Sequence, residues 1–145
     1  MLLLRLRIVI ATFVVGVIAA GCGNVAKQTS IKAEEEYQGI TTDIRTDSIT
    51  EVLVELGDVA YSSIATKRLR LKNTTNTTLS LLDYKSTCRC TWISLPNGAI
   101  APGEYGELEL TFDSRGEYGS VGNYIDISTS NADCRIGVWM SAKVI

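Results

Sequence analysis

The residues of this sequence that are most able to do chemistry are its four cysteines, which stand at positions 22, 88, 90 and 134. The sequence contains no histidine, which excludes Ser-His-Asp and Cys-His catalytic pairs, HExxH zinc helices and imidazole acid–base catalysis. A tetrahedral zinc site needs four ligands, and none of them can be an imidazole here. Most familiar hydrolytic chemistry is thereby excluded, although pairs of carboxylic acids of the glycosidase type are not. Our leading prediction is a protein that is not an enzyme and that holds no metal and no cofactor.

Cys88 and Cys90 are separated by one residue, whereas thioredoxin-like motifs place two residues between their cysteines. In an extended segment their Cα atoms would lie about 6.6 to 7 Å apart, at the upper edge of what a disulfide spans, so a bond between them needs a kink in the chain. Three arrangements stay open. They are a structural disulfide from Cys88 or Cys90 to Cys134, buried thiols without a bond, and a soft-metal or thiol-redox site.

Cys22 follows a segment that is typical of a cleaved signal peptide. Arg5 and Arg7 precede a mostly apolar run over residues 8–20, which is shorter than the about 20 residues that a membrane-spanning helix needs. Small residues end this run directly before Cys22, and this pattern resembles the lipobox of bacterial lipoproteins. The resemblance implies that residues 1–21 are removed and that Cys22 is the lipid attachment site. An ordinary cleaved signal with a chance cysteine is the alternative.

A lipid on Cys22 would anchor the protein to a membrane of the bacterial cell envelope, facing the periplasm or the exterior. Residues 22–48 are predicted to form a flexible tether, because they are mostly polar, include Glu34-Glu35-Glu36 and show no lasting period of 2 or 3.6. The other three cysteines would then lie in an oxidising compartment, where an odd count leaves one thiol unbonded or bonded to another molecule.

Residues 49–145 show the alternation of apolar and polar side chains that is typical of strands with one buried face. The alternation is clear over residues 69–72, 107–113 and 125–127, and it continues over residues 136–144. Turn-forming clusters separate these segments, and no helical period of useful length is present. The pattern predicts one all-β domain, an antiparallel immunoglobulin-like β-sandwich.

The only basic cluster of this domain alternates along one predicted strand. If that strand neighbours the strand around residue 108, the outward-facing Arg68, Arg70 and Lys72 would face the outward-facing Glu107 and Glu109 across the ladder. The cluster contains no aromatic residue, and we expect solvated ion pairs there and no nucleic-acid binding. Trp139 has the opposite parity to its buried neighbours, so it is predicted to be exposed.

Four segments of the predicted domain carry recognisable motifs in a fixed order. They are Leu56-Gly57-Asp58-Val59, Leu69-Arg70-Leu71-Lys72-Asn73-Thr74, Ser86-Thr87-Cys88-Arg89-Cys90-Thr91 and Ile100-Ala101-Pro102-Gly103-Glu104. Together they resemble the bacterial domain-of-unknown-function family numbered 1573, which lies within the Hydin and PapD-like group of immunoglobulin-like domains. The resemblance implies an immunoglobulin-like fold and an extracytoplasmic, often lipid-anchored setting, and it implies no established activity.

Taken together, these patterns predict a membrane-anchored extracytoplasmic lipoprotein whose sandwich is a binding or scaffold module. Its expected partners are the membrane, through the lipid, and another extracytoplasmic protein, which an exposed strand edge would accept by β-addition. The alternative is a membrane-tethered thiol-redox or soft-metal-handling protein that uses Cys88 and Cys90.

Overall fold

The structure is a computed structural model, and it describes residues 37–46 and 48–145. These residues form nine strands and no helix long and apolar enough to cross a membrane. The predicted signal peptide and Cys22 lie outside the described residues. The strands are β1 (Ile40–Ile44), β2 (Ser48–Val59), β3 (Ile64–Asn73), β4 (Leu79–Ser86), β5 (Thr91–Ser94), β6 (Ala99–Ile100), β7 (Tyr105–Asp113), β8 (Gly119–Thr129) and β9 (Cys134–Val144).

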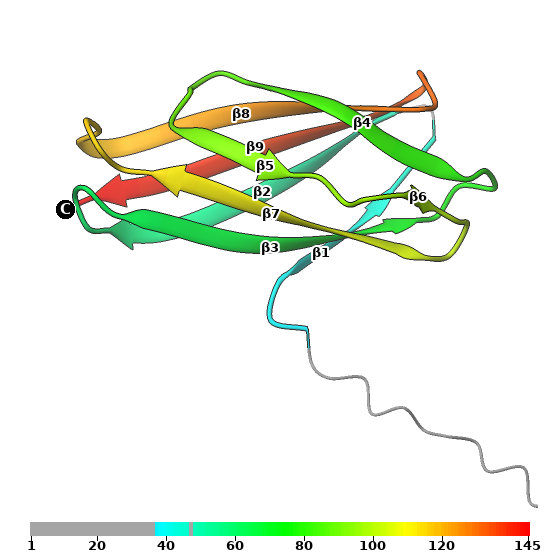
Figure 1. The fold of residues 1–145 in the computed structure, drawn as a ribbon, viewed down its shortest axis with the longest axis horizontal. Coiled ribbons are helices and arrows are strands. Elements are labelled where there is room, and N and C mark those ends of the chain that lie inside the picture. The colour runs from blue at the N-terminus through cyan, green and yellow to red at the C-terminus, as the bar shows by residue number, and fades with distance from the viewer. Residues whose placement is uncertain (1–36, 47) are drawn as a thin grey trace, which may run out of the picture. The chain divides into compact units, whose positions relative to one another are not determined.

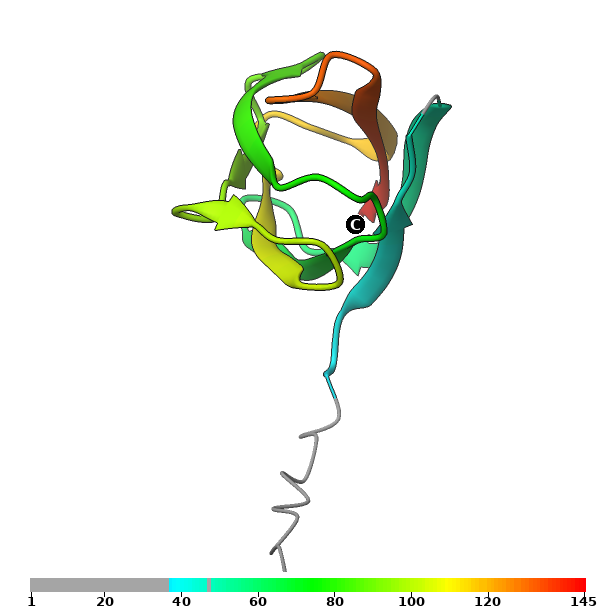
Figure 2. The same ribbon diagram turned by 90° about the vertical axis from the view of Figure 1, so that its right-hand side faces the viewer.

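The strands form two sheets that face each other (Figures 1 and 2). One sheet has the order β1-β3-β7-β5, and the other has the order β2-β9-β8-β4-β6. Every pairing is antiparallel except β1 with β3 and β2 with β9, which are parallel. The predicted all-β sandwich is therefore confirmed, and the two parallel pairs are additions that the sequence pattern did not indicate.

The core lies between the sheets and consists of the inward-facing positions of the predicted alternations. Leu110 and Phe112 of β7 are fully buried, and they face the fully buried Ile125 and Ile127 of β8 and Ile136 of β9 in one hydrophobic cluster. The faces that the period of two assigns to these strands are thus confirmed. Such a core supplies most of the stability of a domain of this size.

The prediction of a flexible tether over residues 22–48 is wrong at its C-terminal end. Residues 40–44 form β1, which pairs with β3 and buries Ile44 completely. The chain then passes to the other sheet, where β2 begins at Ser48. Only Ile40 and Ile44 are apolar in β1, so its alternation is too sparse to be recognised, and the edge of β3 provides the pairing that stabilises it.

Candidate functional site

Cys88 and Cys90 form a disulfide with each other, and their Cα atoms lie 5.2 Å apart. The kink that this bond needs is a turn between β4 and β5, in which the Thr91 N–H donates to the Cys88 carbonyl at 3.3 Å. The Ser86 hydroxyl also donates to this carbonyl, at 2.8 Å. The expectation that Cys88 and Cys90 are buried unbonded thiols is therefore wrong.

The expected disulfide from Cys88 or Cys90 to Cys134 is also wrong, because the fold holds these residues far apart. The turn lies beside Asn123 and Tyr124 of β8, and Asn123 is opposite Met140 of β9. Cys134 begins β9, six residues before Met140, which is about 20 Å at about 3.3 Å per residue. Cys134 is completely buried in the core.

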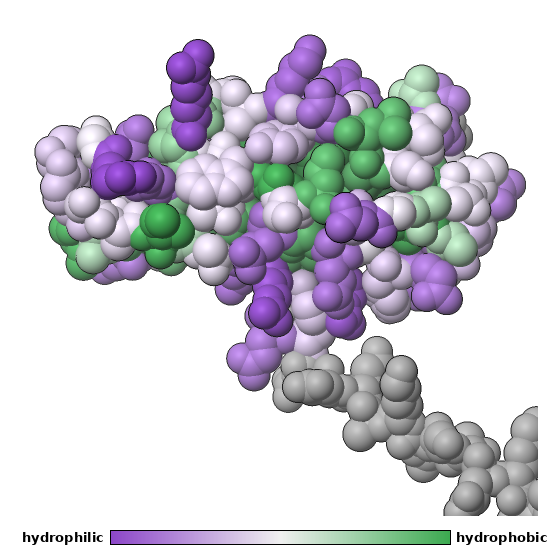
Figure 3. Space-filling model, in the orientation of Figure 1, coloured by the Kyte–Doolittle hydropathy of each residue, from purple (hydrophilic) through white to green (hydrophobic). Residues whose placement is uncertain are grey.

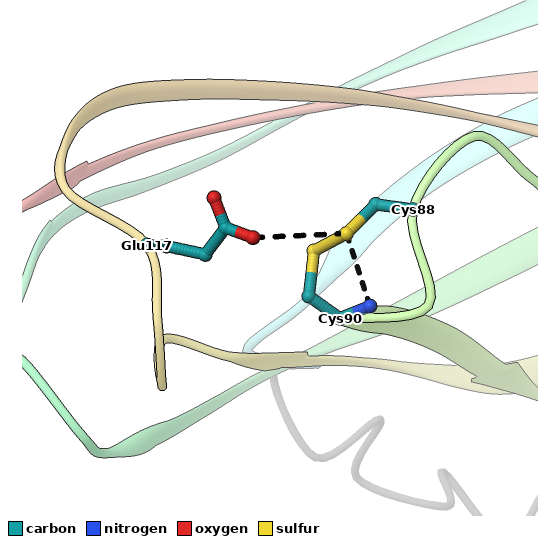
Figure 4. Close-up of side chains that lie close together, drawn as sticks. All are labelled: Cys88, Cys90 and Glu117. Atoms are coloured by element: carbon teal, nitrogen blue, oxygen red, sulfur yellow. Dashed lines mark hydrogen bonds between the residues drawn. A yellow bond between two sulfur atoms is a disulfide. The ribbon is translucent and has the colours of Figure 1, made fainter.

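Each sulfur of the disulfide accepts a hydrogen bond from an N–H group. The Cys90 N–H lies 3.0 Å from the Cys88 Sγ (Figure 4), and the Asn123 side-chain amide lies 3.3 Å from the Cys90 Sγ. Asn123 is only 7% exposed, and its amide also donates to the Thr91 hydroxyl at 2.8 Å. The amide is therefore fixed in position next to Cys90. Sequence reasoning missed Asn123, because nothing local connects it to a turn more than 30 residues earlier.

Glu117 approaches the disulfide from the loop between β7 and β8 (Figure 4). Its Oε1 lies 3.9 Å from the Cys88 Sγ, and one ligand atom from each of Cys88, Cys90 and Glu117 lies within 4.8 Å of the others. A disulfide sulfur has no proton to donate and is no thiolate, so the Glu117 contact becomes a hydrogen bond, and the cluster becomes a ligand set, only after reduction.

The disulfide contributes little to stability by constraining the unfolded chain. The chain-entropy relation gives about 1.5 kcal/mol for a loop of about three residues, compared with about 3 kcal/mol for a 15-residue loop. The turn is also held by the Asp113 N–H, which donates to the Cys90 carbonyl at 2.8 Å, and by the Thr87 N–H, which donates to the Tyr124 carbonyl at 2.9 Å. The local shape therefore has several supports besides the S–S bond.

Two members of the basic cluster on β3 face glutamates of β7, as the sequence predicted, whereas Lys72 lies opposite Tyr105. Arg68 lies opposite Glu109 and Arg70 lies opposite Glu107 in the β3–β7 register. The Arg70 guanidinium contacts the Glu107 carboxylate at 2.6 Å and also lies 5.3 Å from the centre of the Tyr105 ring. These groups form a mixed-charge surface on the outside of the four-stranded sheet, which favours solvation over phosphate binding.

Two exposed apolar side chains and the half-buried Tyr124 form a row across the outer face of the five-stranded sheet. Leu53 of β2 lies opposite Trp139 of β9, which lies opposite Tyr124 of β8. Leu53 is 66% exposed and Trp139 is 48% exposed, which confirms the prediction for Trp139. The Trp139 and Tyr124 rings are 4.5 Å apart. We call Leu53, Trp139 and Tyr124 the apolar row.

A second exposed apolar region lies over β4 and β5, on the face that Figure 3 shows. β4 carries Leu82, which is 61% exposed, and β5 carries Trp92, which is 38% exposed. Leu82 points outward because it follows the buried Leu81 along the strand, and a bulge in the β4–β8 register between Leu81 and Asp83 leaves Asp83 exposed as well. These two residues lie on different sheets, so they do not form a row like that of Leu53 and its neighbours.

A family model described as a protein of unknown function, DUF1573, matches residues 48–144. No curated protein matches the sequence. Among solved structures, a protein of unknown function from Porphyromonas gingivalis W83 is 14% identical with a TM-score of 0.55, and the match covers 77% of this chain and 51% of that one. The chain thus spans about half of that protein's length.

The ASH / PapD-like domain of human CEP192 is 13% identical with a TM-score of 0.54, and the match covers 70% of this chain and 83% of that domain. The Vibrio cholerae protease VesB is also 13% identical, with a TM-score of 0.50, and the match covers only 31% of that chain. At these identities the similarities show a shared PapD-like fold and nothing about activity.

Proposed function

Because this chain belongs to the DUF1573 family of proteins of unknown function, we propose from its PapD-like sandwich that it is a binding or scaffold module without catalytic activity. The observation that carries this proposal is the apolar row. Monomeric proteins expose scattered apolar residues, but adjacent exposed apolar and aromatic side chains on one sheet are typical of a contact surface for another protein.

The apolar row reaches a strand edge that a partner can use. Among the described residues, β2 pairs only with β9, so the other edge of this 12-residue strand has backbone groups available for pairing. Glu51 and Glu55 are exposed and flank Leu53 on the same face of β2. A partner strand that pairs with this edge and carries, on the same face, an apolar side chain between two basic ones would match Leu53 in hydrophobicity and the two glutamates in charge.

Replacing Leu53 with Asp is expected to abolish binding of the partner while leaving stability almost unchanged. Leu53 is already mostly exposed, and a surface substitution usually changes the free energy of unfolding by no more than about 0.5 kcal/mol. The measurement is site-specific photocrosslinking from β2 in native membranes, followed by identification of the crosslinked protein by mass spectrometry.

The matched control is Leu82→Asp, because Leu82 has similar exposure but lies outside the apolar row. We expect the Leu82 variant to give the wild-type crosslink and the Leu53 variant to lose it. Equal crosslinking by all three proteins would show that the apolar row is not the binding surface.

The proposed setting of this module is the surface of a membrane, with a lipid on Cys22 as the anchor. The support is the apolar run that ends in small residues directly before Cys22. Two or three acyl chains on that residue would hold the protein firmly at the membrane. The partner would accordingly be another extracytoplasmic protein that lies close to the same membrane.

Replacing Cys22 with Ser is expected to move the protein from the membrane fraction to the soluble extracytoplasmic fraction. The wild-type protein should carry the added mass of a diacylglycerol on Cys22, which is its first residue after cleavage, and the variant should carry no such mass. Fractionation and intact-mass spectrometry measure the two effects. A Cys22 variant that stays in the membrane, with an unmodified wild type, would instead indicate an uncleaved signal anchor.

A further inference from the structure

We propose that the Cys88–Cys90 disulfide is a thiol–disulfide exchange site, which accepts electrons from the dithiol of a partner protein. Asn123 would stabilise the departing thiolate of Cys90, and Glu117 would accept a hydrogen bond from the Cys88 thiol. The site adjoins the apolar row, because Thr87 of this turn hydrogen-bonds the backbone of Tyr124, but the proposal does not depend on the binding function proposed above.

The first argument is that this bond can open without unfolding the domain. A bridge across one residue closes nearly the smallest possible loop, so it removes little freedom from the unfolded chain. The hydrogen bonds of the turn from Thr91, Ser86 and Asp113 involve no sulfur atom, so we expect them to remain after reduction. The local structure therefore does not need the bond, which distinguishes it from a disulfide that joins distant segments.

The second argument is that the protein supplies N–H donors where a thiolate would form. A hydrogen bond to the charged form of a group stabilises that form, and a stabilised thiolate is a better leaving group in exchange. Cys90 has the donor best suited to this role, because the Asn123 amide is buried and is held by Thr91 at 2.8 Å. Cys90 is thus the sulfur that leaves.

The third argument concerns Cys88, which is the sulfur that an incoming thiolate would attack. Cys88 and Cys90 are partly buried, and Arg89 between them is exposed. The positive charge of Arg89 would attract an approaching thiolate, and it would partly offset the repulsion of that thiolate by the negative charge of Glu117. After reduction, the carboxylate of Glu117 at 3.9 Å would hold the proton on Cys88, so the two sulfurs would differ in charge.

The exchange proceeds in two displacements. A partner thiolate attacks the Cys88 Sγ, the S–S bond breaks, and its electron pair leaves on the Cys90 Sγ. The second partner thiol then loses its proton and attacks the partner sulfur of the mixed disulfide, which returns an electron pair to the Cys88 Sγ. Two electrons and two protons leave the partner dithiol, which becomes a disulfide. One proton binds Cys88, and the other binds Cys90 or enters solvent.

In the test, the purified full chain is equilibrated with mixtures of reduced and oxidised dithiothreitol, and the free thiols are then trapped with a maleimide. Peptide mapping locates the labelled cysteines, so that Cys88 and Cys90 are distinguished from Cys22 and Cys134. We expect reversible reduction of Cys88 and Cys90 with an unchanged circular dichroism spectrum. The Asn123→Ala variant should be reduced about tenfold more slowly at neutral pH, and its alkylation profile should move to higher pH.

Two further variants keep the test decisive. Thr91→Val removes the hydroxyl that holds the Asn123 amide beside Cys90, so it should also slow exchange, but by less than Asn123→Ala because the amide itself remains. Glu117→Gln removes the carboxylate, and it should be attacked several-fold faster even if Asn123→Ala does not fold. The proposal is overturned if reduction requires unfolding, if neither Asn123→Ala nor Glu117→Gln changes the rate, or if the reduced protein retains stoichiometric copper or zinc and does not exchange.

Discussion

Replacing Asn73 with Ala is expected to lower the free energy of unfolding by about 4 kcal/mol, because this completely buried side chain connects several loop segments. Its amide donates to the Thr77 and Ile100 carbonyls, both at 2.8 Å. Its Oδ1 accepts from the Thr75 N–H at 3.0 Å and from the Thr75 hydroxyl at 2.7 Å. Alanine would remove these four hydrogen bonds, each worth about 1 kcal/mol, and the Thr75 hydroxyl and the Thr77 carbonyl would keep their mutual contact at 3.0 Å.

Urea denaturation of the purified protein, with tryptophan fluorescence as the readout, measures this change. Asn76→Ala is the matched control, since Asn76 is exposed in the same loop and its loss should change stability by no more than about 0.5 kcal/mol. If both variants lose the same stability, the hydrogen bonds of Asn73 are not what holds this end of the sandwich.

The buried faces of the long strands could be predicted from sequence because a period of two is a local property. Leu110 and Ile127 alternate with polar neighbours, and this alone assigns each to the core. That Arg68 and Arg70 face Glu107 and Glu109 was also within reach, because outward-facing residues on neighbouring strands lie across from each other, but the individual pairs depend on the register. Such features need no information about exact turn geometry.

The candidate thiol site was harder to predict, because its parts come from three distant segments. The sequence places Cys88 and Cys90 together, but the 5.2 Å between their Cα atoms depends on a turn. Glu117 and Asn123 reach that turn only when β8 packs beside it. Asn73 was similarly hidden, since an Asn followed by two Thr residues is typical of an exposed polar turn, and only the fold shows that it is buried.

The two isoleucines of β1 explain why the start of the folded domain was placed too late, and they lead to a second prediction with a large effect. A chain of residues 49–145 is expected to be less stable than a chain of residues 37–145 by at least about 4 kcal/mol. Loss of the fully buried Ile44 alone should account for about 2 to 5 kcal/mol. The shorter chain also loses the β1–β3 pairing and the bond from the Thr74 hydroxyl to the Ile44 carbonyl at 2.5 Å.

Circular dichroism melts of the two chains measure this difference, because small single domains usually unfold cooperatively. Within the longer chain, Ile44→Ala should reproduce much of the loss, whereas Ile49→Ala should have little effect because Ile49 is 52% exposed. Equal melting temperatures for the two chains would mean that β1 adds no stability and that β3 tolerates an open edge. A large difference would mean that the domain begins before residue 49, so that fewer residues separate it from the proposed lipid on Cys22 and it lies closer to the membrane.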